Sequence, residues 1–158
     1  VIPGLEETYP YTLQGEEIPI YLAEQKADAY TLENNDLLIT ADTIVWLNGH
    51  VYGKPADEAE AREMLRSLSG KTHDVITGVC VRTNKKNVSF ASTTKVRFAK
   101  LTDAEIEHYV NKYRPMDKAG AYGIQEWIGY IGVEHIEGSY FNVMGLPIQR
   151  LYTVLKEF

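Results

Sequence analysis

Several features that would point to a particular class of protein are scarce or absent in these 158 residues. The single cysteine, Cys80, cannot form an internal disulfide bond, so we expect a reducing compartment such as the cytoplasm. The apolar runs fall well short of the roughly 18 residues that a membrane-spanning helix requires, so no membrane partner is expected. A net charge of −6 is unfavourable for binding the backbone of a nucleic-acid polymer.

Familiar catalytic motifs are also missing or incomplete. The stretch Ser69–Thr72 resembles the end of a P-loop, but Leu65 stands at the position of that motif's first glycine, and a helix precedes the stretch instead of a strand. The histidines are scattered without the spacing of a zinc site. No Gly-x-Ser-x-Gly elbow, no cysteine–histidine pair and no Gly-x-Gly-x-x-Gly turn is present. Covalent and dinucleotide chemistries are therefore disfavoured.

Periodicity and turn signals predict helices and strands that interleave along one domain. Helices are expected over residues 17–32, 58–68, 102–112 and 146–157, and strands over 37–47, 51–52, 73–83, 88–100 and 131–136. Asn48-Gly49 is a strong hairpin signal, Asp57 is suited to cap a helix, and Thr102 with Glu105 matches a capping box. Hairpins argue against an all-parallel sheet, so the pattern indicates an α/β or α+β fold with a mixed, twisted sheet and flanking helices.

Acids and lysines beside predicted turns are the strongest candidates for chemistry. Asp42 lies inside an apolar strand, where a carboxylate is costly unless it meets a cation or a metal. It is therefore either a structural acid paired with a lysine or a metal ligand or general base. Lys54, between Gly53 and Pro55, lies in a stiff turn that can aim its ammonium group. Lys26 is predicted on a helix surface, and Glu7 can cap a helix, bind a metal or face solvent.

The irregular segment 117–125 combines small residues with polar ones. Its glycines and alanines allow the backbone to approach a ligand closely. Gln125 offers both a hydrogen-bond donor and an acceptor, and Lys118 is a further candidate for binding substrate. On residue types alone, the segment is either a ligand-binding loop or an ordinary turn.

Seven short segments, each a weak signal alone, form a specific pattern when they are taken in order. They are Gly4–Glu7, Ala23–Ala27, Ala41–Val45, Gly53–Pro55, Met64–Gly70, Asp117–Gln125 and Gly138–Pro147. This ordered set resembles the Maf family of nucleoside triphosphate pyrophosphatases, also called septum formation inhibitors. The resemblance implies a two-lobed fold related to the inosine triphosphate pyrophosphatases, with a nucleotide cleft between the lobes. It also implies hydrolysis of a nucleoside triphosphate to the monophosphate and pyrophosphate.

The resemblance assigns roles to individual residues. Asp42 matches the proton acceptor of the family, and Glu7, Lys26 and Lys54 match its other active-site positions. Glu7 and Asp42 are the expected ligands of a divalent cation, Mg²⁺ or alternatively Mn²⁺. Lys26 and Lys54 are expected to neutralise the β and γ phosphates.

Substrate choice and assembly follow from the same resemblance. Thr43 and Gln125 match the positions that set base choice, and these residue types match the subgroup that prefers dTTP and UTP. The family also suggests a homodimer.

One departure from the family and two alternatives accompany this reading. Family members carry a strand and a Ser-x-Ser-Pro-Arg-Arg loop upstream of the Glu6-Glu7 pair, and residues 1–158 are expected to be a single Maf-like domain lacking both. A nucleotide-sensing or partner-binding protein in cell-division control, with little turnover, is one alternative. The same reaction on a modified nucleotide such as 7-methyl-GTP is the other.

Overall fold

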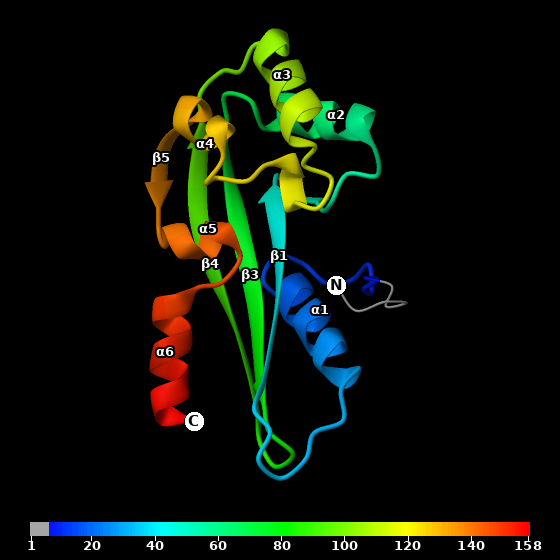
Figure 1. The fold of residues 1–158 in the computed structure, drawn as a ribbon, viewed down its shortest axis with the longest axis vertical. Helices are drawn as coiled ribbons and strands as arrows, with labels where there is room; N and C mark the ends of the chain where they lie inside the picture. The colour runs from blue at the N-terminus through cyan, green and yellow to red at the C-terminus, as the bar shows by residue number, and fades with distance from the viewer. Residues whose placement is uncertain (1–6) are drawn as a thin grey trace.

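The computed structural model describes residues 7–158, so residues 4–6 of the first matching segment lie outside the described part. Figure 1 shows an antiparallel sheet with helices packed around it. Its five strands lie in the order β2-β1-β3-β4-β5. They are β1 (Leu38–Leu47), β2 (His50–Tyr52), β3 (Thr72–Arg82), β4 (Asn87–Phe98) and β5 (Val133–Glu137). The α/β class is confirmed, and within the described residues the predicted mixed sheet is antiparallel throughout.

The helices agree with most of the sequence-based prediction. They are α1 (Glu17–Asp28), α2 (Glu58–Leu68), α3 (Asp103–Tyr113), α4 (Trp127–Gly132), α5 (Tyr140–Met144) and α6 (Ile148–Glu157), with a 3₁₀ turn η1 over Ala119–Ala121. Asp57 caps α2, and Thr102 and Glu105 form the predicted capping box of α3. Between Glu7 and Phe158, no helix is both long and apolar enough to cross a membrane.

The differences from prediction have physical causes. Helix α1 ends at Asp28 and not near residue 32, and Tyr30, the last residue of the predicted apolar stripe, is half exposed. The short helices α4 and α5 were not predicted, since a helix of five or six residues shows too little periodicity to be recognised. Strand β5 begins at Val133, two residues later than predicted, because α4 extends to Gly132.

Residues of β1 alternate between the two faces of the sheet. Ile44 packs against Ile18 and Leu22 of α1, whereas Ala41 packs beside residues of α6 and of the segment before it. Figure 1 shows α2, α3 and α4 at one end of the long strands β3 and β4, and α1 and α6 toward the other end. This elongated arrangement agrees with the two-lobed fold that the family resemblance implies.

Helix α1 packs unusually close to β3 at Gly78. An ideal Cβ built on Gly78 would lie 2.3 Å from the carbonyl carbon of Pro19, a distance that real Cβ atoms do not show. Gly78 is the cross-strand partner of Asp42, so the close approach occurs beside the candidate carboxylate. The absence of a side chain at Gly78 therefore allows α1 to place Lys26 next to β1.

We predict that Gly78→Ala destabilises the protein by about 3 kcal/mol, because the added methyl group pushes α1 away from the sheet. Urea denaturation followed by circular dichroism measures the change in the free energy of unfolding. Gly53→Ala is the matched control: a Cβ there meets no atom within 4 Å, and we expect a change below about 1 kcal/mol. Equal stability of both variants would contradict the packing argument.

Candidate active site

A cavity of about 210 Å³ opens beside the edge of β1. The three-residue strand β2 pairs only with Val45–Leu47, so within the described residues the rest of β1 has no strand on that side. The cavity is lined by residues of α1, β1, the 117–125 segment and the end of α5. All the predicted site residues except Glu7 line it: Lys26, Asp42, Thr43, Lys54, Lys118 and Gln125. Glu7 lines an adjoining hollow that shares Lys26 and Lys54.

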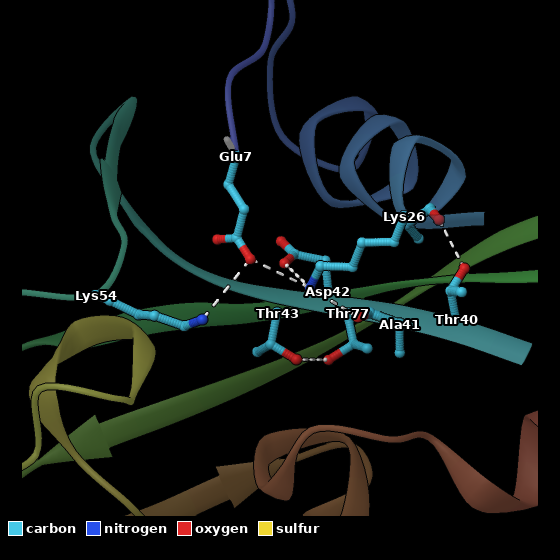
Figure 2. A network of polar contacts seen from close by, with 9 residues as sticks. Glu7, Lys26, Thr40, Ala41, Asp42, Thr43, Lys54 and Thr77 are labelled. Carbon is cyan, nitrogen blue, oxygen red and sulfur yellow. Dashed lines mark hydrogen bonds and ion pairs between the residues drawn. The ribbon is translucent and has the colours of Figure 1, made fainter. Parts of the chain in front are cut away.

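Asp42 and Thr43 lie on opposite faces of β1, since successive side chains of a strand alternate. Figure 2 shows Asp42 on the side of Lys26 and Glu7, and Thr43 directed away from them toward Thr77. A cavity at a sheet edge can receive groups from both faces. The strand edge therefore brings a charged half and a neutral polar half into one site.

The charged half is a chain of ion pairs. Lys26 Nζ lies 2.8 Å from Asp42 Oδ1 and donates a second hydrogen bond to the carbonyl oxygen of Ala41 at 3.3 Å. Glu7 Oε1 lies 3.4 Å from Lys26 Nζ and 3.7 Å from Lys54 Nζ, so it bridges the two lysines (Figure 2). Asp42 thus pairs with a lysine, as one of its two sequence-based alternatives predicts. It also lines a cavity, and its role as a metal ligand or general base stays a prediction.

Burial and charge compete at the ion pair. Burial raises the pKa of Asp42, which is only 8% exposed, and the negative charge of Glu7 adds to this. The hydrogen bond and charge of Lys26 lower the pKa of Asp42, but the net direction is upward. Burial lowers the pKa of Lys26, whereas Asp42 and Glu7 together raise it more, so the ammonium group stays protonated at neutral pH.

The segment 117–125 is held in place by the side chain of Tyr109. The Tyr109 hydroxyl accepts a hydrogen bond from the Gly123 backbone N–H at 3.0 Å and donates one to Glu126 Oε1 at 2.6 Å. Burial and that carboxylate raise the pKa of Tyr109, which keeps the hydroxyl proton in place. Exposed Gln125 lies between these two anchored residues and faces the cavity, which fits the predicted ligand-binding loop.

A tight backbone contact joins this segment to the turn that carries Lys54. Gly120 adopts a left-handed conformation (φ 68°), and an ideal Cβ on it would lie 2.7 Å from Val45 Cγ2. Its N–H donates to the carbonyl oxygen of Gly53 at 3.1 Å. Only glycine satisfies both the conformation and the space at this position, so the two sides of the cavity are fixed relative to each other.

Lys118, like Lys26, has two carboxylate partners. Its ammonium lies 3.1 Å from Asp117 Oδ1 and 3.9 Å from Glu126 Oε1. The hydrogen bond and charge of Lys118 lower the pKa of Asp117. Lys118 lines the cavity, and its part in binding substrate stays a prediction.

Sequence reasoning missed a network on the neutral face. The Thr43 hydroxyl lies 2.8 Å from the Thr77 hydroxyl, which in turn lies 3.2 Å from the main-chain carbonyl oxygen of Asn142. The Asn142 side-chain amide donates to Val75 O and Ser92 O, both at 3.1 Å. The sequence did contain a signal for this network: Thr77 places a hydroxyl inside the apolar stretch Val75–Val81, just as Asp42 places a carboxylate inside an apolar strand.

The donor set suits a hard divalent cation in part. Among residues 7–158, no group of three or more histidine, cysteine, aspartate or glutamate side chains converges. Glu7 and Asp42 nevertheless both contact Lys26, so two carboxylates face one small volume. Mg²⁺ is commonly held by one or two carboxylates together with substrate phosphates and water, so two carboxylates supply the donor chemistry for such an ion. In this structure the Lys26 ammonium group lies against both of them.

The fold and the site define an α/β protein whose cavity has one wall of paired charges and one neutral polar wall. Comparison with known sequences identifies it further: the chain belongs to the Maf-like protein family, whose sequence model matches residues 1–158. The resemblance predicted from the ordered segments is thereby confirmed.

Similar curated proteins are named dTTP/UTP pyrophosphatase. The Phocaeicola vulgatus protein is 63% identical over 158 residues, covering 99% of this chain and 82% of that relative. The Parabacteroides distasonis protein is 58% identical over 160 residues, covering 100% of this chain and 83% of that relative. The Porphyromonas gingivalis protein is 51% identical over 161 residues, covering 99% of this chain and 81% of that relative.

The opposing effects on Asp42 give a prediction that needs no assay of activity. Lys26→Met should raise the pKa of Asp42, because it removes the hydrogen bond and positive charge that favour the carboxylate. Glu7→Gln should lower it, because it removes a neighbouring negative charge. The measurement is an NMR titration of the Asp42 carboxyl carbon in metal-free buffer. The control variant is Lys118→Met, since Lys118 lines the same cavity. Shifts in the pKa of Asp42 that have the same sign in Lys26→Met and Glu7→Gln would contradict the arrangement.

Proposed function

We propose that the protein hydrolyses dTTP and UTP between the α and β phosphates, and releases the nucleoside monophosphate and pyrophosphate. The observation that carries this proposal is the convergence of Lys26, Lys54 and buried Asp42 on one cavity. It is supported by relatives named dTTP/UTP pyrophosphatase, at identities of 51–63% over nearly the whole chain.

The two lysines supply the site for the phosphates. Both contact Glu7 and both line the cavity, so a triphosphate can replace that carboxylate as their partner. Phosphate oxygens are strong acceptors for ammonium groups, and neutralising their charge removes the repulsion that opposes an attacking oxygen. Lys26 is the more buried lysine, so its interaction with a phosphate is the less screened by solvent.

A divalent cation completes the charge balance. The formal charges of Glu7, Lys26, Asp42 and Lys54 sum to zero, so a triphosphate needs a further positive charge. We propose Mg²⁺, with Mn²⁺ as the alternative, held by Glu7 and Asp42 with the phosphates. Such an ion, when bound, neutralises phosphate charge and lowers the pKa of a coordinated water.

Asp42 is the proposed proton acceptor. The carboxylate is nearly buried yet lines the cavity, and burial raises its pKa toward the range in which a carboxylate is an effective base. Lys26 keeps it ionised and fixes its orientation through the 2.8 Å hydrogen bond. Asp42 would take the proton of a water directed at the phosphate chain, and no covalent intermediate is required.

Base choice is proposed for the other face of β1. Gln125 can donate to the O4 and accept from the N3–H of uracil or thymine, and Thr43 can add one hydroxyl contact. A site built to hydrogen-bond one edge rejects a mismatched base, because its own polar groups are left unpaired. The chemistry and the base selection thus lie on opposite sides of one strand.

Other expectations drawn from the sequence stay predictions. These are the cytoplasmic location, the homodimer, the organisation of residues 1–158 as one domain, and a role in septum formation. The cytoplasmic location is proposed from the single, buried cysteine, Cys80. The other three are proposed from the family resemblance.

We predict that Asp42→Asn lowers kcat for UTP at least about 100-fold, because asparagine keeps the shape of the side chain but cannot accept the proton. Steady-state kinetics and a thermal melt of each variant measure rate and folding. Asp74→Asn is the matched control, since Asp74 lies on the same sheet and also pairs with a lysine, Lys95, at 3.1 Å. Near-normal turnover of Asp42→Asn would refute the assignment of the base.

A further inference from the structure

We propose that Thr77 is a positioning residue for base choice: it fixes the Thr43 hydroxyl as a hydrogen-bond acceptor toward the base. This inference rests on the proposed function, because it concerns the nucleobase that the cavity receives. It adds a residue that lies behind the cavity wall, and it specifies that the Thr43 hydroxyl accepts a hydrogen bond from the base.

The geometry places Thr77 directly behind Thr43. The two residues are cross-strand partners on β1 and β3, and their hydroxyl oxygens lie 2.8 Å apart. Figure 2 shows both hydroxyls on the face of β1 opposite to Lys26 and Glu7. Thr77 is fully buried, whereas Thr43 lines the cavity. The Thr77 hydroxyl can therefore reach a ligand only through Thr43.

The acceptor on the far side of Thr77 is rigidly held. The carbonyl oxygen of Asn142 lies 3.2 Å from the Thr77 oxygen, and it also accepts the Gly145 N–H at 3.0 Å. The side-chain amide nitrogen of Asn142 lies within hydrogen-bond distance of three acceptors on β3 and β4: Val75 O, Ser92 O and Thr94 Oγ1. Helix α5 is thereby anchored to the sheet, and the main-chain carbonyl group of Asn142 faces Thr77.

Counting hydrogen atoms fixes the direction of the chain. A hydroxyl carries one hydrogen to donate, and a carbonyl oxygen can only accept. If Thr77 donates to Asn142, Thr43 must donate to Thr77, and both hydrogen bonds form. If Thr77 donated to Thr43 instead, its contact with the carbonyl oxygen would contain no hydrogen. Buried polar groups adopt the arrangement that satisfies more of them, so the order is Thr43 to Thr77 to Asn142.

The consequence is a difference between pyrimidines. With its hydrogen committed to Thr77, Thr43 presents only lone pairs to the cavity. Uracil and thymine carry an N–H donor at N3, whereas cytosine carries an unprotonated N3 that can only accept. Where the Thr43 oxygen faces N3, it shares the N3–H of uracil or thymine with the Gln125 amide oxygen, whereas with cytosine its lone pairs oppose the lone pair of N3. Thr77 therefore biases the cavity toward uracil and thymine, beyond what Gln125 provides.

The test compares Thr77→Val with Thr77→Ser in their kcat/KM for UTP and CTP. Valine removes the acceptor and frees the Thr43 hydroxyl to rotate and donate to cytosine, so the UTP/CTP ratio should fall about tenfold. Serine keeps the hydroxyl and should preserve the ratio. Thermal melts establish folding, and Thr77→Ala gives the same readout if the valine variant does not fold. An unchanged ratio in Thr77→Val, or an equal fall in Thr77→Ser, would overturn the inference.

A double-mutant cycle separates positioning from general loss of packing. In a Thr43→Val background, Thr77→Val should cause no further change in the UTP/CTP ratio, because Thr77 acts through Thr43. A further fall of the same size would overturn the inference.

Failure of the proposed function is distinguishable from failure of this inference. Wild-type protein that releases no pyrophosphate from UTP refutes the proposed function. The ratio of Kd values for UMP and CMP, measured by calorimetry in the same variants, still decides the role of Thr77. A ratio that falls in Thr77→Val and not in Thr77→Ser supports the role, and binding of neither monophosphate overturns it.

Discussion

The ion pair between Lys26 and Asp42 is the interaction around which the rest of the site is arranged. It is largely removed from water, so it requires close placement of α1 against β1, and Gly78 permits that placement by carrying no side chain. The short strand β2 leaves the neighbouring part of β1 without a strand on that side in the described residues, so the pair faces a cavity. A buried pair that faces a cavity is better explained by chemistry than by stability.

Strand alternation divides the site into two halves with different tasks. The charged half on the α1 side suits phosphates and the activation of water, and the neutral half on the α5 side suits a base. The proposed pyrophosphatase needs both halves, because it must hydrolyse one particular phosphoanhydride bond and must do so in one class of nucleotide. Gly120 contacts Val45 and donates to Gly53, and Tyr109 holds Gly123. These contacts fix the segment that carries Gln125 relative to the turn that carries Lys54.

The sequence predicted elements that have local signals and missed contacts that arise between distant elements. The Asp57 cap, the capping box at Thr102 and the hairpin at Asn48 each depend on a few neighbouring residues, and the structure shows all three. The isolated acid Asp42 and the stiff turn at Lys54 identified the charged half for the same reason. The side chains of Thr77, Asn142 and Tyr109 act through partners that are 14 to 67 residues away in the chain, which no local pattern reveals.

The most direct test of the account is the identity of the phosphate product. Purified protein with Mg²⁺ is incubated with UTP, dTTP, CTP or 7-methyl-GTP, and pyrophosphate and orthophosphate are quantified separately. Cleavage between the α and β phosphates predicts pyrophosphate, released mainly from UTP and dTTP, with one nucleoside monophosphate formed per pyrophosphate. Orthophosphate with a nucleoside diphosphate, or release from 7-methyl-GTP in preference to UTP and dTTP, would contradict it.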